Sequence, residues 1–400
     1  MGYTKLTLLQ KYSEAGLFFI KYGACMFNHI DTLNDLNKHI PLKEKIVRAH
    51  EEIKKSLPFI ARIAIAIYDP QTRILKTFIH SSEIDNPLEN YQTSIDNAPS
   101  LKRILEKGLP RVVNNLLTFD GNNKEHSQRI GRTGYAASYT MPMFNDGDFL
   151  GFIFFNSYEA DVFTETNLNH VDIFGHMISL MIIKELTTIN ILTAALKTTG
   201  RITHMRDPET GSHLDRMSRY SRLIASALAD KYDLKDDYIE HIFMFSPLHD
   251  IGKIAIPDDI LMKPDSLDDD EMKIMKTHAE KGREIIDEIL DNFALKGINY
   301  VDILRNIAES HHEAMNGSGY PHGKSGDEIP LEARIVAVAD IFDALTSKRP
   351  YKEAWSNEMA FTELRKLATD KLDQDCVNAL LENEHEIDFI QKQFKENIIG

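Results

Sequence analysis

The feature that most constrains the fold is a change in hydrophobic periodicity near residue 164 of the 400-residue chain. Before it, four segments carry the apolar-rich pattern of strands, and turn sequences such as DPQT and NDGD separate them. These segments are residues 62–69, 73–81, 134–144 and 149–158. After it, apolar residues recur every three or four positions, which indicates helices, and no convincing strand follows residue 203. The sequence therefore predicts a multidomain α+β chain with an α/β domain first and an all-α helical bundle last.

The chain is too long for one average domain, because domains usually hold roughly 100 to 200 residues. Four parts are predicted: an N-terminal helical segment (1–44), an α/β regulatory domain (45–185), a connecting helix (186–202) and a C-terminal helical domain (203–400). In its order of elements the second part resembles a GAF-type sensor domain. Sensors of that family often bind small ligands, but no binding residue can be matched here, so a ligand-free role in dimerisation stays open.

The helical pattern from residue 164 to 202 is longer than the 8 to 20 residues of an ordinary globular helix. Four apolar residues fit the a and d positions of a coiled-coil seam: Val171, Phe174, Ile178 and Met181. Glu185 and Thr188 then break the pattern. Two interpretations follow: a short parallel coiled coil, with a homodimer formed through the N-terminal domain and this helix, or a single buried helix.

Composition excludes several classes of protein. The formal net charge of −15 disfavours binding to nucleic acid polymers or to an anionic membrane surface. Cys25 and Cys376 are the two cysteines, far apart in sequence, so neither a disulfide framework nor a cysteine-based zinc site is expected. The apolar stretch GLFFIKYGACMF contains a lysine and falls well short of the roughly 20 residues that span a bilayer. These features predict a cytoplasmic protein without a membrane segment.

The C-terminal half contains five histidines and three carboxylates in patterns that suit metal ligation. They are Glu209, His213, His249, Asp250, His278, His311, His312 and Asp340. Taken singly, each histidine is more often a hydrogen-bonded core residue. However, Asp340 lies in a nearly continuous apolar helix with no basic residue within one turn, and His213 continues an apolar helical stripe. Adjacent histidines such as His311 and His312 can both be ligands only where the metals lie between several helices or the pair sits at a helix end.

Eight candidate ligands exceed what one ion uses, so at least two divalent metal ions are predicted. Mixed nitrogen and oxygen ligands suit iron, manganese, zinc or nickel better than calcium. Two ions about 3.5 to 4 Å apart are the arrangement of many phosphoryl hydrolases, and it requires a bridging carboxylate. Asp250 is the candidate bridge, and Glu209 could bring in a third ion.

Three segments, HDIGK, HHE…GSGYP and VAVADIFDALTSKRPYK, together resemble the HD-GYP branch of the HD phosphohydrolases over residues 200 to 385. The resemblance implies hydrolysis of a cyclic dinucleotide, cyclic di-GMP or cyclic GMP-AMP, to a linear product. It implies metal ligation by the same eight residues, with iron or manganese as the first expectation and nickel or zinc as the second. It also makes Lys253 a catalytic proton donor beside Asp250, and the Gly-Tyr-Pro loop a docking surface for diguanylate cyclase-type partners. Substrate contacts are implied for Gly319, Tyr320, Pro321, Arg349 and Lys352.

One departure from the family pattern concerns base recognition. Members commonly read Arg-Trp-Asp before the Gly-rich turn, whereas this chain has Ala314, Met315 and Asn316. The choice between cyclic di-GMP and cyclic GMP-AMP therefore stays open, with His322 and Lys324 as candidate replacements for the missing arginine. Two other functions stay open as well: a non-catalytic cyclic dinucleotide receptor, and an HD hydrolase of mononucleotides or alarmones.

Overall fold

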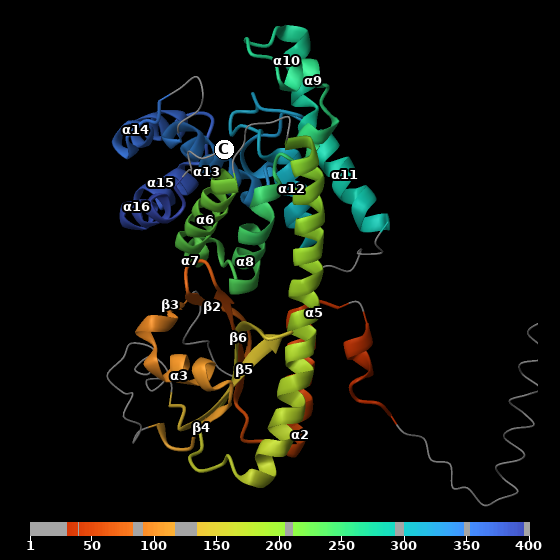
Figure 1. Cartoon of the computed structure of the whole chain (residues 1–400), viewed down its shortest axis with the longest axis vertical. Helices are drawn as coiled ribbons and strands as arrows, with labels where there is room; N and C mark the ends of the chain where they lie inside the picture. The colour runs from red at the N-terminus through yellow and green to blue at the C-terminus, as the bar shows by residue number, and fades with distance from the viewer. Residues whose placement is uncertain are drawn as a thin grey trace, which may run out of the picture. The chain divides into compact units, whose positions relative to one another are not determined.

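The computed structural model describes residues 30–38, 40–82, 91–116, 134–204, 211–292, 300–347 and 353–395, with only the backbone for 195–204. The chain divides into two compact units, Met1–Lys38 and His39–Gly400. Within the first unit the structure describes one short 3-10 helix, η1 (Asn34–Asn37). Most of the predicted N-terminal helical segment, residues 1–29, lies outside the described residues. The second unit contains both the sheet and the helical bundle (Figure 1).

A six-stranded antiparallel sheet forms the first half of the second unit, in the order β3-β2-β1-β6-β5-β4. The strands are β1 (Arg62–Asp69), β2 (Ile74–Ser82), β3 (Gln92–Ser94), β4 (Arg111–Val113), β5 (Ala137–Asn145) and β6 (Asp148–Ser157). The last two predicted strands form a hairpin, in which Asp146 and Gly147 join β5 to β6 with φ values of 51° and 95°. The four strands predicted from periodicity are present, whereas β3 and β4, three residues each, were not predicted.

Side chains alternate between the two faces of this sheet, and helices cover both. Ile63 and Ile65 of β1 pack in a core with α2 (Leu42–Ser56) and with α5 (Glu165–His204). Ala64 and Ala66 point to the opposite face, where Leu101 of α3 (Pro99–Lys107) covers them. The predicted α/β domain therefore has a hydrophobic core on each face of its sheet.

Helix α5 runs from the sheet into the helical bundle (Figure 1). For the predicted seam the structure supports the second interpretation, a single buried helix, because Val171 and Ile178 are fully buried in the chain's own core beside the sheet. Phe174 and Met181 are partly buried against the same core. Residues Glu165–Ala194 are long and apolar enough to pass a length-and-composition test for a membrane span, a test that core helices also pass. Here one side of the helix packs on protein, and Tyr139 of β5 donates a hydrogen bond to Asp172.

The second half of this unit is an all-helical bundle, as predicted. Its α-helices are α6 (Gly211–Ala227), α7 (Ala229–Tyr232), α8 (Asp236–Phe245), α9 (Asp258–Leu261), α10 (Asp269–Lys276), α11 (His278–Asn292), α12 (Val301–Ser310), α13 (Leu331–Thr346), α14 (Asn357–Leu367), α15 (Gln374–Leu381) and α16 (Glu384–Gln393). Short 3-10 helices are η4 (Ser246–Leu248), η5 (Ile251–Ala255) and η6 (Gly326–Glu328). Tyr220 of α6 packs edge to face on Phe342 of α13 at the centre of the core. In the described part of the bundle no strand occurs, although one isolated bridge joins Asn316 and Ser325.

Charged side chains connect the β1–β2 hairpin to α6 and α8. Lys76 of β2 is buried, with its Nζ 3.6 Å from Glu240 and 3.8 Å from Asp69. Arg219 lies 3.3 Å from Asp69, and Arg222 lies 2.5 Å from Glu240. We call these five residues the hairpin cluster. Because each charge faces an opposite charge, the cluster fixes the sheet against the helix that carries His213.

Candidate metal centre

The candidate ligands sit where helices begin or end. His311 and His312 follow the last residue of α12, His278 opens α11, and His249 and Asp250 lie between η4 and η5. His213 lies in the first turn of α6 and Asp340 in the second half of α13. The adjacent pair thus stands at a helix end, as the sequence required, and the two rings lie 4.0 Å apart at 42° to each other.

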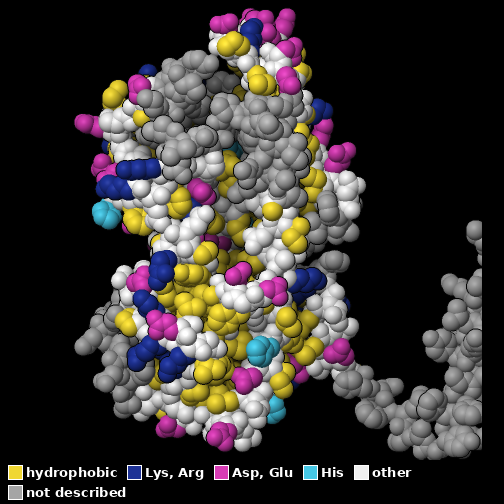
Figure 2. Space-filling model, viewed as in Figure 1, with side chains coloured by type: hydrophobic (Ala, Val, Ile, Leu, Met, Phe, Trp, Pro, Cys, Tyr) yellow, Lys and Arg dark blue, Asp and Glu magenta, His cyan; other side chains and the backbone are white. Residues whose placement is uncertain are grey.

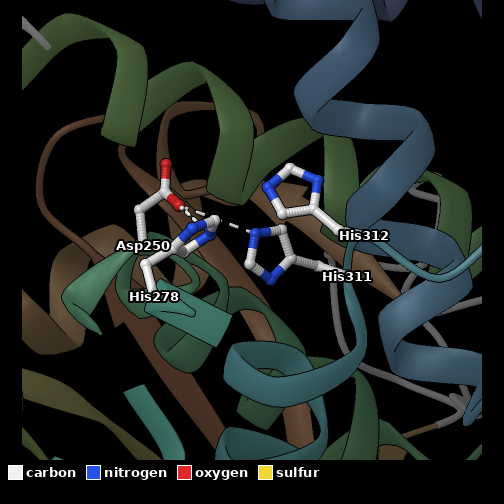
Figure 3. A group of neighbouring side chains, drawn as sticks. All are labelled: Asp250, His278, His311 and His312. Carbon is white, nitrogen blue, oxygen red and sulfur yellow. Dashed lines mark ion pairs between the residues drawn. The ribbon is translucent and has the colours of Figure 1, made fainter. Parts of the chain in front are cut away.

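Seven of the eight predicted ligands form two neighbouring groups. In each group the candidate ligand atoms all lie within 4.8 Å of one another. The first group is Asp250, His278, His311 and His312, and the second is His213, His249 and Asp340. Figure 3 shows His278 and His311 directed at one oxygen of Asp250, at 3.1 and 3.6 Å from Oδ1. Glu209 lies outside the described residues.

His249 links the two groups. Its Nε2 lies 3.2 Å from Oδ2 of Asp250 and 3.9 Å from Oδ1 of Asp340. Asp250 therefore offers one carboxylate oxygen to each side, which is the geometry expected of a bridging ligand between two ions.

Backbone carbonyls orient the histidine rings. The Nδ1 of His249 lies 3.1 Å from the oxygen of Ser246, and that of His278 lies 2.8 Å from the oxygen of Met275. The Nδ1 of His311 lies 2.9 Å from the oxygen of Ile307. A carbonyl can only accept, so each Nδ1 carries the hydrogen and each Nε2 presents a lone pair to the site. This tautomer is the one that a metal ligand needs.

Several polar atoms of the site are buried without a hydrogen-bond partner. Among the described residues they include Nε2 of His278, Nε2 of His311 and Oδ1 of Asp250, because the short approaches between them lack hydrogen-bond geometry. Buried polar atoms of this kind are rare and costly. His50, a buried histidine elsewhere, shows the usual alternative: both its ring nitrogens are paired, at 2.8 and 2.9 Å. The site therefore has the donor set of a metal centre and could hold metal ions.

The charges of the site match this interpretation. Burial alone would raise the pKa of Asp250, but Lys253 and His249 hold it well below its usual range. Burial lowers the pKa of His311 and, with the neighbouring His311 ring, that of His312. The carboxylate is thus ionised and these imidazoles are neutral near pH 7, the forms that bind divalent cations.

Asp343 is a residue of the site that the sequence reasoning missed. It is fully buried, accepts from Nδ1 of His213 at 2.7 Å, and is held by Arg216 at 2.6 Å. Burial raises its pKa, but His213 and Arg216 more than compensate and lower it. The signal was present in the sequence, because Asp343 lies in the same apolar helix as Asp340, three residues further along.

Lys253 and Tyr320 stand beside the first group. The Nζ of Lys253 lies 2.8 Å from Oδ2 of Asp250. The Tyr320 ring stacks on His312 with centroids 4.7 Å apart, and the Tyr320–Pro321 peptide is cis. A Cβ at Gly319 would lie 2.3 Å from the backbone nitrogen of Ala314, so only glycine allows the loop to pass this close.

The remaining predicted residues divide into two sets. Arg349 and Lys352 lie outside the described residues. His322 and Lys324, the candidate replacements for the missing arginine, both contact Glu309, at 3.3 and 3.9 Å. Ala314 is buried, and Asn316 donates to Asp370 at 2.8 Å. Ala314 therefore packs inside the protein, and Asn316 ties the loop to Asp370.

Comparisons with known proteins agree with this geometry. Residues 205–376 match the family described as HD domain. The cyclic di-GMP phosphodiesterase response regulator RpfG of Xanthomonas campestris is 44% identical over 49% of this chain and 49% of its own. The 3'3'-cGAMP-specific phosphodiesterase 2 of Vibrio cholerae is 40% identical over 44% of this chain and 32% of its own. A cyclic di-GMP phosphodiesterase of Thermotoga maritima is 36% identical over 52% of this chain and 53% of its own.

The chain spans about half the length, or less, of these curated relatives. Among solved structures, the GAF domain/HD domain protein from Geobacter sulfurreducens aligns with a TM-score of 0.31 and 14% identity, over 37% of this chain and 95% of that chain. This likeness is too low to carry an argument. Residues 205–376 are therefore similar to the HD domain family, and this stretch contains all seven described candidate ligands.

Proposed function

We propose that the C-terminal domain is a metal-dependent phosphodiesterase that hydrolyses a cyclic dinucleotide, cyclic di-GMP or 3'3'-cyclic GMP-AMP, to a linear dinucleotide. The observation that carries the proposal is the convergence of seven histidine and aspartate side chains, oriented by their hydrogen bonds, on two adjoining groups. The names of the relatives support the substrate class, since they include both cyclic di-GMP and 3'3'-cGAMP phosphodiesterases.

Two divalent ions would be held by the two groups, and Glu209 would add a ligand for a third. Iron or manganese is the first expectation and nickel or zinc the second, because imidazole and carboxylate together suit all four. When bound, such ions supply Lewis-acid stabilisation of phosphoryl oxygens and activate water near pH 7. The geometry above supports this ligand assignment, because Asp250 contacts His249 of the second group and the Nε2 lone pairs of the orienting histidines point inward.

Lys253 would donate a proton to the leaving oxygen. Its Nζ lies 2.8 Å from Oδ2 of Asp250, so this ion pair holds the side chain at the site before substrate binds. Tyr320, stacked on His312, would form the wall against which a nucleotide base packs, with Gly319 and Pro321 fixing its backbone. Arg349 and Lys352 would bind the second phosphate, as the family resemblance implies.

Product analysis tests this function. Purified protein, loaded anaerobically with iron or manganese, is incubated with each cyclic dinucleotide, and the products are separated by anion exchange. Linear dinucleotide from either substrate is expected. Tight binding of the nucleotide without product, with metal content verified, would favour the receptor alternative. Hydrolysis of mononucleotides or alarmones alone would favour the other alternative, an HD hydrolase of those substrates.

The same assay addresses base choice. Ala314, Met315 and Asn316 stand where the family resemblance implies Arg, Trp and Asp. We therefore propose that the ratio of the two hydrolysis rates differs from that of a variant carrying Arg, Trp and Asp at these positions. Equal ratios would show that this loop segment has no part in base choice.

Regulation and partners complete the proposal. The GAF-like domain (45–185) would regulate the catalytic domain (203–400) through the connecting helix (186–202), in a cytoplasmic protein. The exposed part of the Gly-Tyr-Pro loop would contact diguanylate cyclase-type partners. Deleting residues 1–190 should then change the rate of hydrolysis and not the product, whereas an unaltered rate would remove the regulatory role.

A further inference from the structure

Helix α5 has an outer face that differs from the face predicted to form a coiled coil. Its inner face is fully buried at Val171, Ile178 and Ile189, in the cores of the sheet and of the bundle. On the outer face, Ile173, Leu180 and Ile191 expose 66%, 67% and 58% of their surface. Figure 2 shows hydrophobic side chains on the viewer's side of the molecule along the course of α5. Scattered apolar residues are normal on a surface, but an aligned row is not.

The three exposed residues lie on one line along the helix. Each residue turns the helix by about 100°, so Ile191, five full turns after Ile173, has the same direction, and Leu180 deviates by only about 20°. Between them, the same line passes through partly or fully exposed residues at alternating spacings of four and three. The complete row is Ile173, Met177, Leu180, Lys184, Thr187 and Ile191, and of these Met177 is partly buried against the core of the sheet. We call this row the outer seam.

The spacing of the outer seam is that of a two-stranded coiled coil. Ile173, Leu180 and Thr187 take d positions, and Met177, Lys184 and Ile191 take a positions. A single lysine at an a position is one of the devices that fix register and favour two strands, at a cost in stability. The aliphatic stem of Lys184 can cover the seam while its ammonium group reaches water.

We propose that the outer seam binds the outer seam of a second copy of this chain, in parallel and in register. The charge distribution supports this occupant. The chain carries a net charge of −15, yet none of the flanking e and g positions holds a carboxylate. Those positions are Phe174, His176, Met181, Ile183, Thr188 and Asn190. Glu185, the one acidic residue between 173 and 191, lies at a b position, away from the seam. Two acidic chains can therefore approach along this face with little repulsion.

The outer seam would be the contact surface of the homodimer that the sequence predicts. This proposal rests on α5 alone and does not depend on the phosphodiesterase function. Lipid is a weaker occupant, because Lys184, Thr187 and Asn190 interrupt the apolar surface, and because the inner face is already covered by protein. The seam is about 30 Å long, long enough for a specific but small interface.

Cysteine cross-linking tests the register directly. In a Cys25→Ser background, in which the remaining Cys376 is buried, Leu180→Cys is expected to form a disulfide-linked dimer under mild oxidation, because d positions face their counterparts in a parallel pair. The matched control is Leu109→Cys, since Leu109 is 63% exposed and lies off the helix. Equal cross-linking of the two variants, or none of Leu180→Cys, would overturn the proposal.

Light scattering on the full-length protein gives the second test. At tens of micromolar the wild type is expected at twice the 45.7 kDa of one chain. Leu180→Glu should raise the dissociation constant at least about tenfold, because it places two charges in the seam, whereas Leu109→Glu should leave it unchanged. Circular dichroism should show equal helix content in both variants. A monomeric wild type, or a mass that depends on added phospholipid vesicles or on residues 1–29 instead of Leu180, would contradict the proposal.

Discussion

The metal centre and the hairpin cluster are both buried groups of ionisable side chains, but they treat their polar atoms differently. In the hairpin cluster each charge has an opposite charge nearby: Arg222 lies 2.5 Å from Glu240, and Arg219 lies 3.3 Å from Asp69. In the metal centre, Nε2 of His278, Nε2 of His311 and Oδ1 of Asp250 converge without hydrogen bonds. A buried cluster that pairs its own charges holds elements together. One that leaves several inward-facing atoms unpaired is arranged for a ligand that the chain does not supply.

A single buried polar atom without a hydrogen-bond partner does not by itself indicate a ligand site. Nε2 of His241 is also buried without a hydrogen-bond partner, but the ring lies among Phe78, Phe245 and Tyr300, at centroid distances of 4.6 to 6.2 Å. An aromatic environment explains that histidine as part of the core. The difference is convergence: among the described residues, the metal centre gathers seven candidate ligand side chains in two adjoining groups.

The largest expected effect comes from removing the carboxylate of Asp250, the residue that contacts both groups of the metal centre. Asp250→Ala should lower bound metal below one ion per chain and reduce hydrolysis of the preferred cyclic dinucleotide at least about 1000-fold, because both groups lose their common ligand. Metal content by mass spectrometry and product formation measure the two effects. Asp69→Ala, in the hairpin cluster, should keep its full metal content. Unchanged metal content in Asp250→Ala would contradict the proposed difference between the metal centre and the hairpin cluster.

Lys253→Met should leave bound metal at the wild-type level and slow the chemical step by roughly 100- to 10,000-fold, because the leaving oxygen loses its proton donor. Single-turnover kinetics with metal-loaded protein measure the step. Lys366→Met, at an exposed lysine of α14, is the control. A loss of metal from Lys253→Met would reassign the residue from proton transfer to assembly of the site.

Asp343→Asn should weaken metal binding by about 10- to 100-fold, because the amide no longer fixes His213 in the tautomer that presents Nε2. A metal competition assay gives the affinity, and a thermal melt of the metal-free protein separates this effect from lost stability. Asp327→Asn, at a fully exposed carboxylate, is the control. Wild-type affinity in Asp343→Asn would mean that His213 needs no orienting partner.

The smallest effect is expected in the hairpin cluster and concerns stability. Burial lowers the pKa of Lys76 from 10.5 to about 8. Between pH 8 and the unfolded value, the unfolded chain binds more protons than the folded one, so the stability contributed at this residue rises with pH. The difference in the free energy of unfolding between wild type and Lys76→Met, measured by denaturant titration, should therefore shift in favour of wild type by roughly 1–3 kcal/mol as pH rises from 8 to 10. Lys366→Met, at an exposed lysine, should show no such trend.

A pH-independent difference for Lys76→Met would show that the lysine stays charged in the folded protein. The pairing of Lys76 with Glu240 and Asp69 would then offset the cost of burying the charge.

The sequence predicted the chemistry of the site better than its surroundings. Asp340 and the His311–His312 pair stood out because a carboxylate inside an apolar helix and adjacent imidazoles both demand partners. Asp343 satisfied the same criterion and was missed, because its partners His213 and Arg216 lie about 130 residues away in sequence and meet it only in the fold. The hairpin cluster was equally invisible, since it joins β1, β2, α6 and α8.

The coiled-coil seam shows a second limit of sequence reasoning. Seven residues separate Val171 from Ile178, and the same spacing separates Ile173 from Leu180. Periodicity alone therefore cannot distinguish which of these two faces of α5 is buried. Only the packed structure shows that the first pair is covered by the sheet. The strands of three residues, β3 and β4, were missed because so short a run gives no measurable period.

Anomalous diffraction from crystals loaded anaerobically with iron or manganese tests the central claim most directly. The account predicts at least two anomalous peaks, one within the group Asp250, His278, His311 and His312 and one within the group His213, His249 and Asp340. No peak in either group, with metal bound elsewhere on the chain, would contradict it.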